Sequence, residues 1–208
     1  MKLIWSPETA SKALIDTVKS CEIFNESSAA ELVSAMAAGW NAQVVVETWR
    51  RGGAIAASVG LAVAARHSGG RHVCVVADEE SRTEYVKAMR ESGRAAEVVV
   101  GRPEEAMEGL EGIDFLLVDW RRNDLARILR AARLGRRGAV VVCKNVSSDD
   151  FRWRQGKLRI VRSVFLPVGN GLHIAHVGAA SGPAVVTGRS RWIKHIDTRS
   201  GEEMVFRR

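Results

Sequence analysis

Apolar runs and helix-like segments alternate through the middle of the chain. Short runs rich in Val, Leu and Ile predict strands at residues 43–46, 72–77, 97–100, 113–118 and 139–143. The segments between them predict helices at residues 52–66, 81–92, 103–110 and 123–134. Continuous apolar strands that alternate with helices are typical of a parallel sheet covered on both faces. The pattern therefore predicts an α/β domain with helices on both sides of its sheet.

Two helices are expected before the first strand, within residues 1–41. Ser6-Pro7 has the residue types of a helix cap followed by a first helical position. The apolar side chains that share the next helix face are Ala10, Leu14, Val18 and Cys21. The second helix is predicted to start at the capping-box pattern Ser28-Ala-Ala-Glu31.

The last part of the domain has a different pattern. Residues 158–166 and 172–177 are strand-like, and the turn between them is too short for a helical crossover, so an antiparallel hairpin is expected. This gives seven strands in all and places the α/β domain at residues 1–178. Residues 179–208 then form a basic C-terminal extension, with room for a last hairpin around Arg199-Ser200-Gly201.

Charge is spread unevenly over the 208 residues. The net charge is +7, yet residues 151–208 hold 11 Lys and Arg against 3 Asp and Glu, while residues 1–150 hold 20 against 21. This basic region indicates an anionic partner such as nucleic acid, an acidic protein or a phosphorylated substrate, or else only a soluble basic edge. The N-terminus lacks a signal-peptide pattern and no apolar run is long enough to span a membrane, so a cytoplasmic, or cytoplasmic and nuclear, location is expected.

Candidate chemistry gathers where the predicted strands end, because open parallel sheets bind ligands at the carboxyl ends of their strands. The residues at these ends are Glu47, Asp78, Gly101 with Arg102, Asp119, and Lys144 with Asn145. Gly52 and Gly53 open the helix after the first strand, where backbone can approach a ligand and a helix N-terminus favours an anion. Asp78 has two open interpretations, since it can accept hydrogen bonds from ribose hydroxyls or belong to an acidic helix start with Glu79 and Glu80.

The hairpin sequence Leu166-Pro167-Val168-Gly169-Asn170-Gly171-Leu172 resembles the closing hairpin of class I S-adenosylmethionine (SAM)-dependent O-methyltransferases of the caffeoyl-CoA type. The resemblance implies the Rossmann-like class I methyltransferase fold, with a SAM site in the first half of the chain. The family pattern Glu-x-Gly-x-x-x-Gly reads here Glu47-Thr48-Trp49-Arg50-Arg51-Gly52-Gly53, with Trp49 in place of the first glycine. An indole there could obstruct the methionine moiety or stack on it. The SAM contacts implied are Glu47, Trp49, Gly52, Gly53, Asp78, Gly101, Arg102 and Asp119.

The residues that would hold a metal in the metal-dependent relatives are altered here. Those enzymes ligate a divalent cation with an acid at the position of Asp119 and with an Asp-Asn pair, which here reads Lys144-Asn145. They also carry a lysine base where this chain has Arg122, which keeps its proton. We therefore expect no metal, and we expect Asp119 to pair with Lys144 or with a neighbouring Arg.

The whole chain also looks like a plant family of unknown function described as methyltransferase-like, on segments such as Trp5-Ser6-Pro7-Glu8-Thr9-Ala10 and Arg191-Trp192-Ile193-Lys194-His195. That likeness implies the methyltransferase fold and a plant source, and it supplies no substrate.

Two hypotheses about function follow from the sequence. One is a SAM-binding, metal-independent methyltransferase. The other is a catalytically silent methyltransferase-like module that binds an anionic partner through its basic C-terminal region.

Overall fold

The computed structural model describes residues 5–21, 27–119, 125–146, 158–178, 192–196 and 203–207. The helices are α1 Pro7–Cys21, α2 Ser27–Gly39, α3 Ala56–Ser68, α4 Glu79–Glu91, α5 Pro103–Glu108 and α6 Leu125–Ala131. The strands of the main sheet are β1 Val44–Thr48, β2 Arg71–Val76, β3 Glu97–Val100, β5 Phe115–Asp119, β7 Ala139–Lys144, β8 Ile160–Leu166 and β9 Leu172–Val177.

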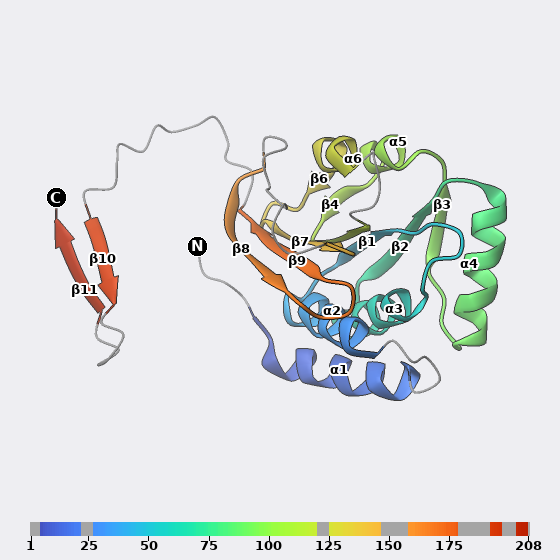
Figure 1. Ribbon diagram of the computed structural model, residues 1–208, viewed down its shortest axis with the longest axis horizontal. Helices are drawn as coiled ribbons and strands as arrows, with labels where there is room; N and C mark the ends of the chain where they lie inside the picture. Colours follow the sequence, from blue (N-terminus) through green and yellow to red (C-terminus); the bar gives the residue numbers. More distant parts are fainter. Residues whose placement is uncertain are drawn as a thin grey trace.

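These seven strands form one sheet in the order β3-β2-β1-β5-β7-β9-β8 (Figure 1). The pairs among β3, β2, β1, β5 and β7 are parallel, whereas β9 runs antiparallel to both β7 and β8. The β8–β9 hairpin is in register from Leu166 opposite Leu172 to Ile160 opposite Val177, with one irregularity. The predicted seven-stranded, mostly parallel sheet with its antiparallel hairpin is confirmed.

Helices cover both faces of the sheet. Helices α1, α2 and α3 lie on one face, and α5 and α6 lie on the other (Figure 1). Alternate residues of each central strand enter the two layers, as in β1, where Val45 packs toward α2 and α3 and Val46 packs toward α5 and α6. Helix α4 joins the first layer, because its Tyr85 and Met89 pack with Val59 of α3. The central strands of the sheet are therefore buried on both faces.

A buried carboxylate divides the strand predicted at residues 113–118. Asp114 accepts a hydrogen bond from the backbone N–H of Gln43 at 2.9 Å and lies 3.5 Å from an Arg137 nitrogen. It separates β5 from a short strand β4, Glu111–Ile113, which pairs in parallel with β6, Arg133–Leu134. The helix predicted at residues 123–134 is therefore too long, since its last residues pair with β4 instead.

The buried face of α1 is also not the predicted one. The buried residues are Ala10, Ala13, Thr17 and Cys21. Leu14 and Val18 are 40% and 43% exposed. Small side chains let α1 lie close to α2 and α3, and the Thr17 hydroxyl is satisfied by bonds to Ala13 O at 2.7 Å and Ser34 Oγ at 2.8 Å. The close packing of α1 against α2 and α3 therefore selects small side chains for the buried face, and the larger Leu14 and Val18 stay exposed.

The C-terminal extension contains the expected last hairpin. Strands β10, Trp192–Ile196, and β11, Glu203–Arg207, pair antiparallel and form a two-stranded sheet of their own. Among the helices of the described residues, none is long and apolar enough to cross a membrane.

Candidate functional site

The winding of the sheet reverses between β1 and β5. From β1 the chain continues to β2 and β3 on one side, and β5 and β7 lie on the other side. Such a reversal opens a crevice at the carboxyl ends of the two central strands, where ligands bind in open α/β sheets. Thr48 ends β1 and Asp119 ends β5, so these two residues mark the candidate site.

Glu47 lies beneath this edge, not at it. Its side chain is fully buried and accepts hydrogen bonds from Ser58 Oγ at 2.9 Å and Tyr85 OH at 2.8 Å. His72 Nε2 lies 3.1 Å from the same carboxylate. Burial alone would raise the pKa of Glu47, but the hydrogen bond and charge of His72 bring this pKa below its ordinary value. Glu47 is therefore an ionised core group that joins β1, β2, α3 and α4.

Trp49 is likewise directed into the core. Its side chain packs with Cys74, Val76 and Tyr85, and its ring meets Tyr85 edge-on at a centroid distance of 5.4 Å. Gly53 makes room for it, because a Cβ at Gly53 would lie 3.1 Å from Trp49 Nε1. In this position the indole neither blocks the edge nor offers its face to a ligand there.

Two buried polar atoms at the end of β1 have no hydrogen-bond partner within the described residues. They are Thr48 Oγ1 and Trp49 Nε1. Both residues are at most 2% exposed. An unsatisfied buried polar group costs about 1–3 kcal/mol, so the end of β1 carries unused hydrogen-bonding capacity beside the switch point.

The loop after β1 is bound to α4 by a hydrogen bond and two ion pairs. Gly52 has the left-handed φ of 68° and donates its backbone N–H to Glu84 Oε1 at 2.9 Å. Arg51 forms ion pairs with Glu80 and with Glu84, the latter at 3.6 Å. The Gly52 N–H, expected to face an anionic ligand, is therefore already bound to a carboxylate of the chain itself.

Asp78 caps α4. Its Oδ1 accepts a hydrogen bond from the Ser81 backbone N–H at 2.7 Å, and this bond lowers the pKa of Asp78. The side chain is exposed and lies two residues beyond the end of β2 at Val76. The structure therefore supports the acidic helix start and leaves an ionised carboxylate at the edge.

Gly101 and Arg102 follow β3. A Cβ at Gly101 would have no atom within 4 Å, so this position opens to solvent. Arg102 is exposed and its Nε donates to Glu105 Oε1 at 2.7 Å. The predicted residues therefore lie in a row along the carboxyl ends of the neighbouring strands β1, β2 and β3.

Asp119 sits in a polar cluster on the other side of the switch point. Its Oδ2 accepts a hydrogen bond from Asn145 Nδ2 at 2.9 Å and lies 3.9 Å from Arg50 Nε. Asn145 Oδ1 in turn accepts from Asn170 Nδ2 at 3.3 Å. The arginine near Asp119 is thus Arg50, from the loop after β1, while the sequence neighbours Arg121 and Arg122 lie outside the described residues. Lys144 lies opposite Asp119 in the β5–β7 register.

The fold and this edge can be compared with known proteins. A model of the family DUF1442, described as a protein of unknown function, matches residues 1–208. The chain belongs to the DUF1442 family. No curated protein sequence matches it.

Several similar solved structures are methyltransferases. One, from Geobacter sulfurreducens, has 20% identity and a TM-score of 0.58, over 83% of this chain and 90% of that one. The O-methyltransferase TomG from Streptomyces achromogenes, in complex with SAM, has 20% identity and a TM-score of 0.55, over 85% and 93% of the two chains. SAH-bound PaMTH1 from Podospora anserina has 11% identity and a TM-score of 0.55, over 85% and 90%. These likenesses show that this DUF1442 chain has the Rossmann-like methyltransferase fold.

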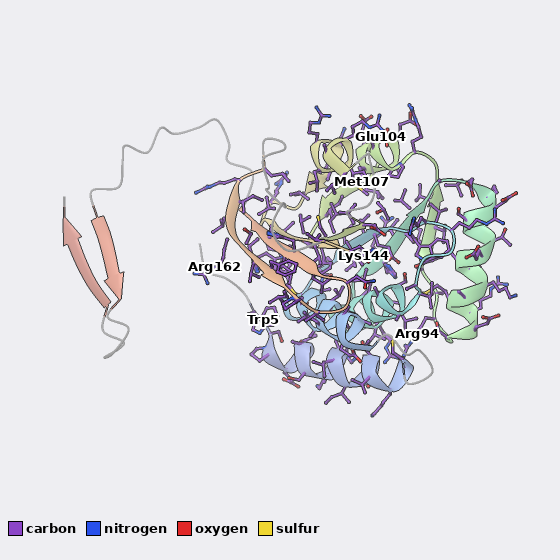
Figure 2. The ribbon with its side chains drawn as sticks, in the orientation of Figure 1. Trp5, Arg94, Glu104, Met107, Lys144 and Arg162 are labelled. Atoms are coloured by element: carbon purple, nitrogen blue, oxygen red, sulfur yellow. The ribbon has the colours of Figure 1, made fainter. Side chains whose placement is uncertain are left out.

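Two arginines in and beside α6 pair with acids of neighbouring elements. Arg127 lies 3.4 Å from Glu104 of α5, and Arg133 lies 2.8 Å from Glu111 of β4. Figure 2 labels Glu104 on α5, in the helix layer that α5 and α6 form. Arg122, which stands in place of the lysine base of the metal-dependent relatives, lies outside the described residues.

Proposed function

We propose that this protein binds SAM and S-adenosylhomocysteine (SAH) at the carboxyl edge around the β1–β5 switch point. The observation that carries the proposal is the buried Thr48 hydroxyl at the end of β1, whose Oγ1 has no hydrogen-bond partner within the described residues. Buried polar groups are rarely left without a partner unless a ligand or water supplies one. The methyltransferase fold supports the same ligand class, because TomG and PaMTH1 are solved with SAM and SAH.

The residues along this edge fit the nucleoside half of such a ligand. Asp78 offers an exposed carboxylate with a lowered pKa, suited to accept hydrogen bonds from ribose hydroxyls. Gly101 leaves open space at the end of β3. Glu47 and Trp49 have a supporting role in this proposal, because they fix the end of β1 and the Gly52-Gly53 loop from below.

Bound SAM would supply a methyl group that is already a good electrophile, so the chain would need mainly to bind and orient the acceptor. Asp119 is held for such a role by Asn145 and Arg50. We propose that no divalent metal takes part. Lys144 stands where a metal-dependent relative has a carboxylate, and at about 4 Å an ammonium repels a divalent ion by roughly 8 kcal/mol at an effective dielectric of 20.

A second candidate function is the silent module that binds an anionic partner. It is favoured by the loop after β1, where Glu84 already accepts the Gly52 N–H that an anionic ligand would use. In that case the basic residues 151–208 would make the contact, in a cytoplasmic or nuclear setting. A plant source and these locations remain expectations from the sequence.

Calorimetric titration with SAH tests the proposed function. Asp78→Asn is the informative variant, because Asn also caps helices and so keeps α4 in place while removing the charge. We expect SAH to bind the unmutated protein and expect Asp78→Asn to weaken binding about tenfold to a hundredfold, equivalent to about 1.4–2.8 kcal/mol. Glu91→Gln, at the far end of α4, is the matched control and should bind normally. Equal binding by Asp78→Asn would exclude Asp78 as a contact.

A further inference from the structure

Two cations, Arg50 and Lys144, lie near the carboxyl ends of β5 and β7. Asp119 supplies one carboxylate, and its side chain is 7% exposed. Arg50 lies 3.9 Å from it, and Lys144 is its neighbour across the strand pair. The nearby Glu47 carboxylate is already satisfied by Ser58, Tyr85 and His72. At this edge, Arg50 contacts the Asp119 carboxylate.

Lys144 differs from Arg50 in its contacts. Within the described part of the chain, no hydrogen bond or ion pair involves its ammonium group, whereas Arg50 contacts Asp119. Lys144 is half-buried and shares a strand face with Val140 and Val142, which pack toward α2 and α3. The positive charge of Lys144 also lowers the pKa of Glu47, by less than His72 does. Figure 2 shows Lys144 in the middle of the molecule, between the two helix layers.

The backbone beside Lys144 is held in an uncommon conformation. Asn145 has a φ of 62°, in the left-handed region that non-glycine residues seldom adopt. Its side chain is fixed on both sides, since it donates to Asp119 and accepts from Asn170 in the β8–β9 turn. Such conformations persist when the surroundings fix them and are concentrated at functional sites. The chain thus holds the end of β7 firmly and leaves the Lys144 ammonium free to meet a ligand.

We propose that Lys144 and Arg50 form a binding site for a small anionic group, a carboxylate or a phosphate, at the ends of β5 and β7. Asn145 is a positioning residue in this site, because it holds Asp119 beside Arg50. As an assignment of the acceptor, the inference rests on the proposed function and gives the acceptor class as an anionic small molecule. Anion binding itself does not require that function.

Chemical labelling of the unmutated full chain tests the site. A neutral N-hydroxysuccinimide acetate reagent acetylates accessible lysines, and peptide mass spectrometry reports the rate at each one. We expect inorganic phosphate or acetate, compared with chloride at equal ionic strength, to slow the labelling of Lys144 at least threefold. Lys87 on α4, with a side chain 77% exposed, is the internal control and should be unaffected. Protection by phosphate alone assigns a phosphorylated acceptor, and protection by acetate as well assigns a carboxylate acceptor. Protection by neither anion overturns the inference.

Variants give a second test. Lys144→Gln and Arg50→Gln should each weaken anion binding at least tenfold in a calorimetric titration, Lys144→Arg should retain part of it, and Lys87→Gln should retain all of it. Unchanged binding by Lys144→Gln would contradict the site. If this variant fails to fold, the labelling of the unmutated chain decides. SAH binding without anion binding refutes only this inference, whereas anion binding without SAH binding refutes only the proposed function.

Discussion

Replacing Tyr85 by Phe tests the buried network that fixes the end of β1. The Tyr85 hydroxyl donates to Glu47 at 2.8 Å, and both side chains are fully buried. Phe keeps the ring that meets Trp49 edge-on, so the substitution removes only the hydroxyl. A hydrogen bond to a charged group contributes about 1.5–3 kcal/mol. We therefore expect Tyr85→Phe to lower the free energy of unfolding by about that amount, and the melting temperature by about 3–12 °C.

Urea unfolding at neutral pH, followed by circular dichroism, measures this loss. Ser11→Ala is the control, because it removes an exposed hydroxyl bonded to Pro7 O and should change stability by less than about 0.5 kcal/mol. A double-mutant cycle with Glu47→Gln isolates the coupling between the two side chains. If Tyr85→Phe were as stable as the unmutated protein, the hydroxyl would not stabilise a Glu47 carboxylate, and our description of Glu47 as an ionised core group would fail.

Two further predictions concern stability. The folded-state pKa of Glu47 lies below the ordinary value of 4.5, so its ionised carboxylate stabilises the fold fully above that pH, and this stabilisation is lost as the pH falls through the folded pKa. The melting temperature, measured from neutral to acid pH, should therefore fall less steeply for Glu47→Gln than for the unmutated protein. Parallel curves for the two proteins would contradict this prediction. Gly171 has a φ of 87°, and a Cβ there would lie 2.0 Å from Val146 O. Gly171→Ala should therefore lower the free energy of unfolding, measured in urea, by about 1–3 kcal/mol. Gly109→Ala is the control and should lower it less, because its Cβ would come no closer than 3.6 Å to a neighbouring atom. Equal losses for the two variants would refute the steric argument.

The parts of the fold that the sequence could predict are those with a local signal. Apolar runs between helix patterns marked the central strands, and the short turn before Leu172 required an antiparallel pair. The exceptions depend on tertiary contacts. Asp114 divides a strand because the Gln43 backbone, distant in sequence, donates to it. On α1 the larger Leu14 and Val18 are exposed, because the close approach of two other helices favours small residues.

The candidate site shows a similar division. The sequence placed Glu47 and Asp119 at strand ends. Asp119 does end β5, whereas Thr48 ends β1 and Glu47 is buried beneath the edge. The sequence could not show that Glu47 is enclosed by Ser58 and Tyr85, since these partners come from two helices. The alternation along β1 was an available signal, because Glu47 has the same parity as Val45 and must face the same helix layer.

The claim that the β1–β5 switch point binds SAH is tested most directly by nuclear magnetic resonance of the 15N-labelled full chain, titrated with SAH to about 1 mM, the range of a weak ligand. The Trp49 indole N–H is a suitable reporter, because it is buried at the end of β1 and has no partner within the described residues. We predict that its signal and the amides of Thr48, Gly52 and Asp78 shift on titration, while those of β10 and β11 do not. Unchanged spectra, or shifts confined to β10 and β11, would contradict the proposed site.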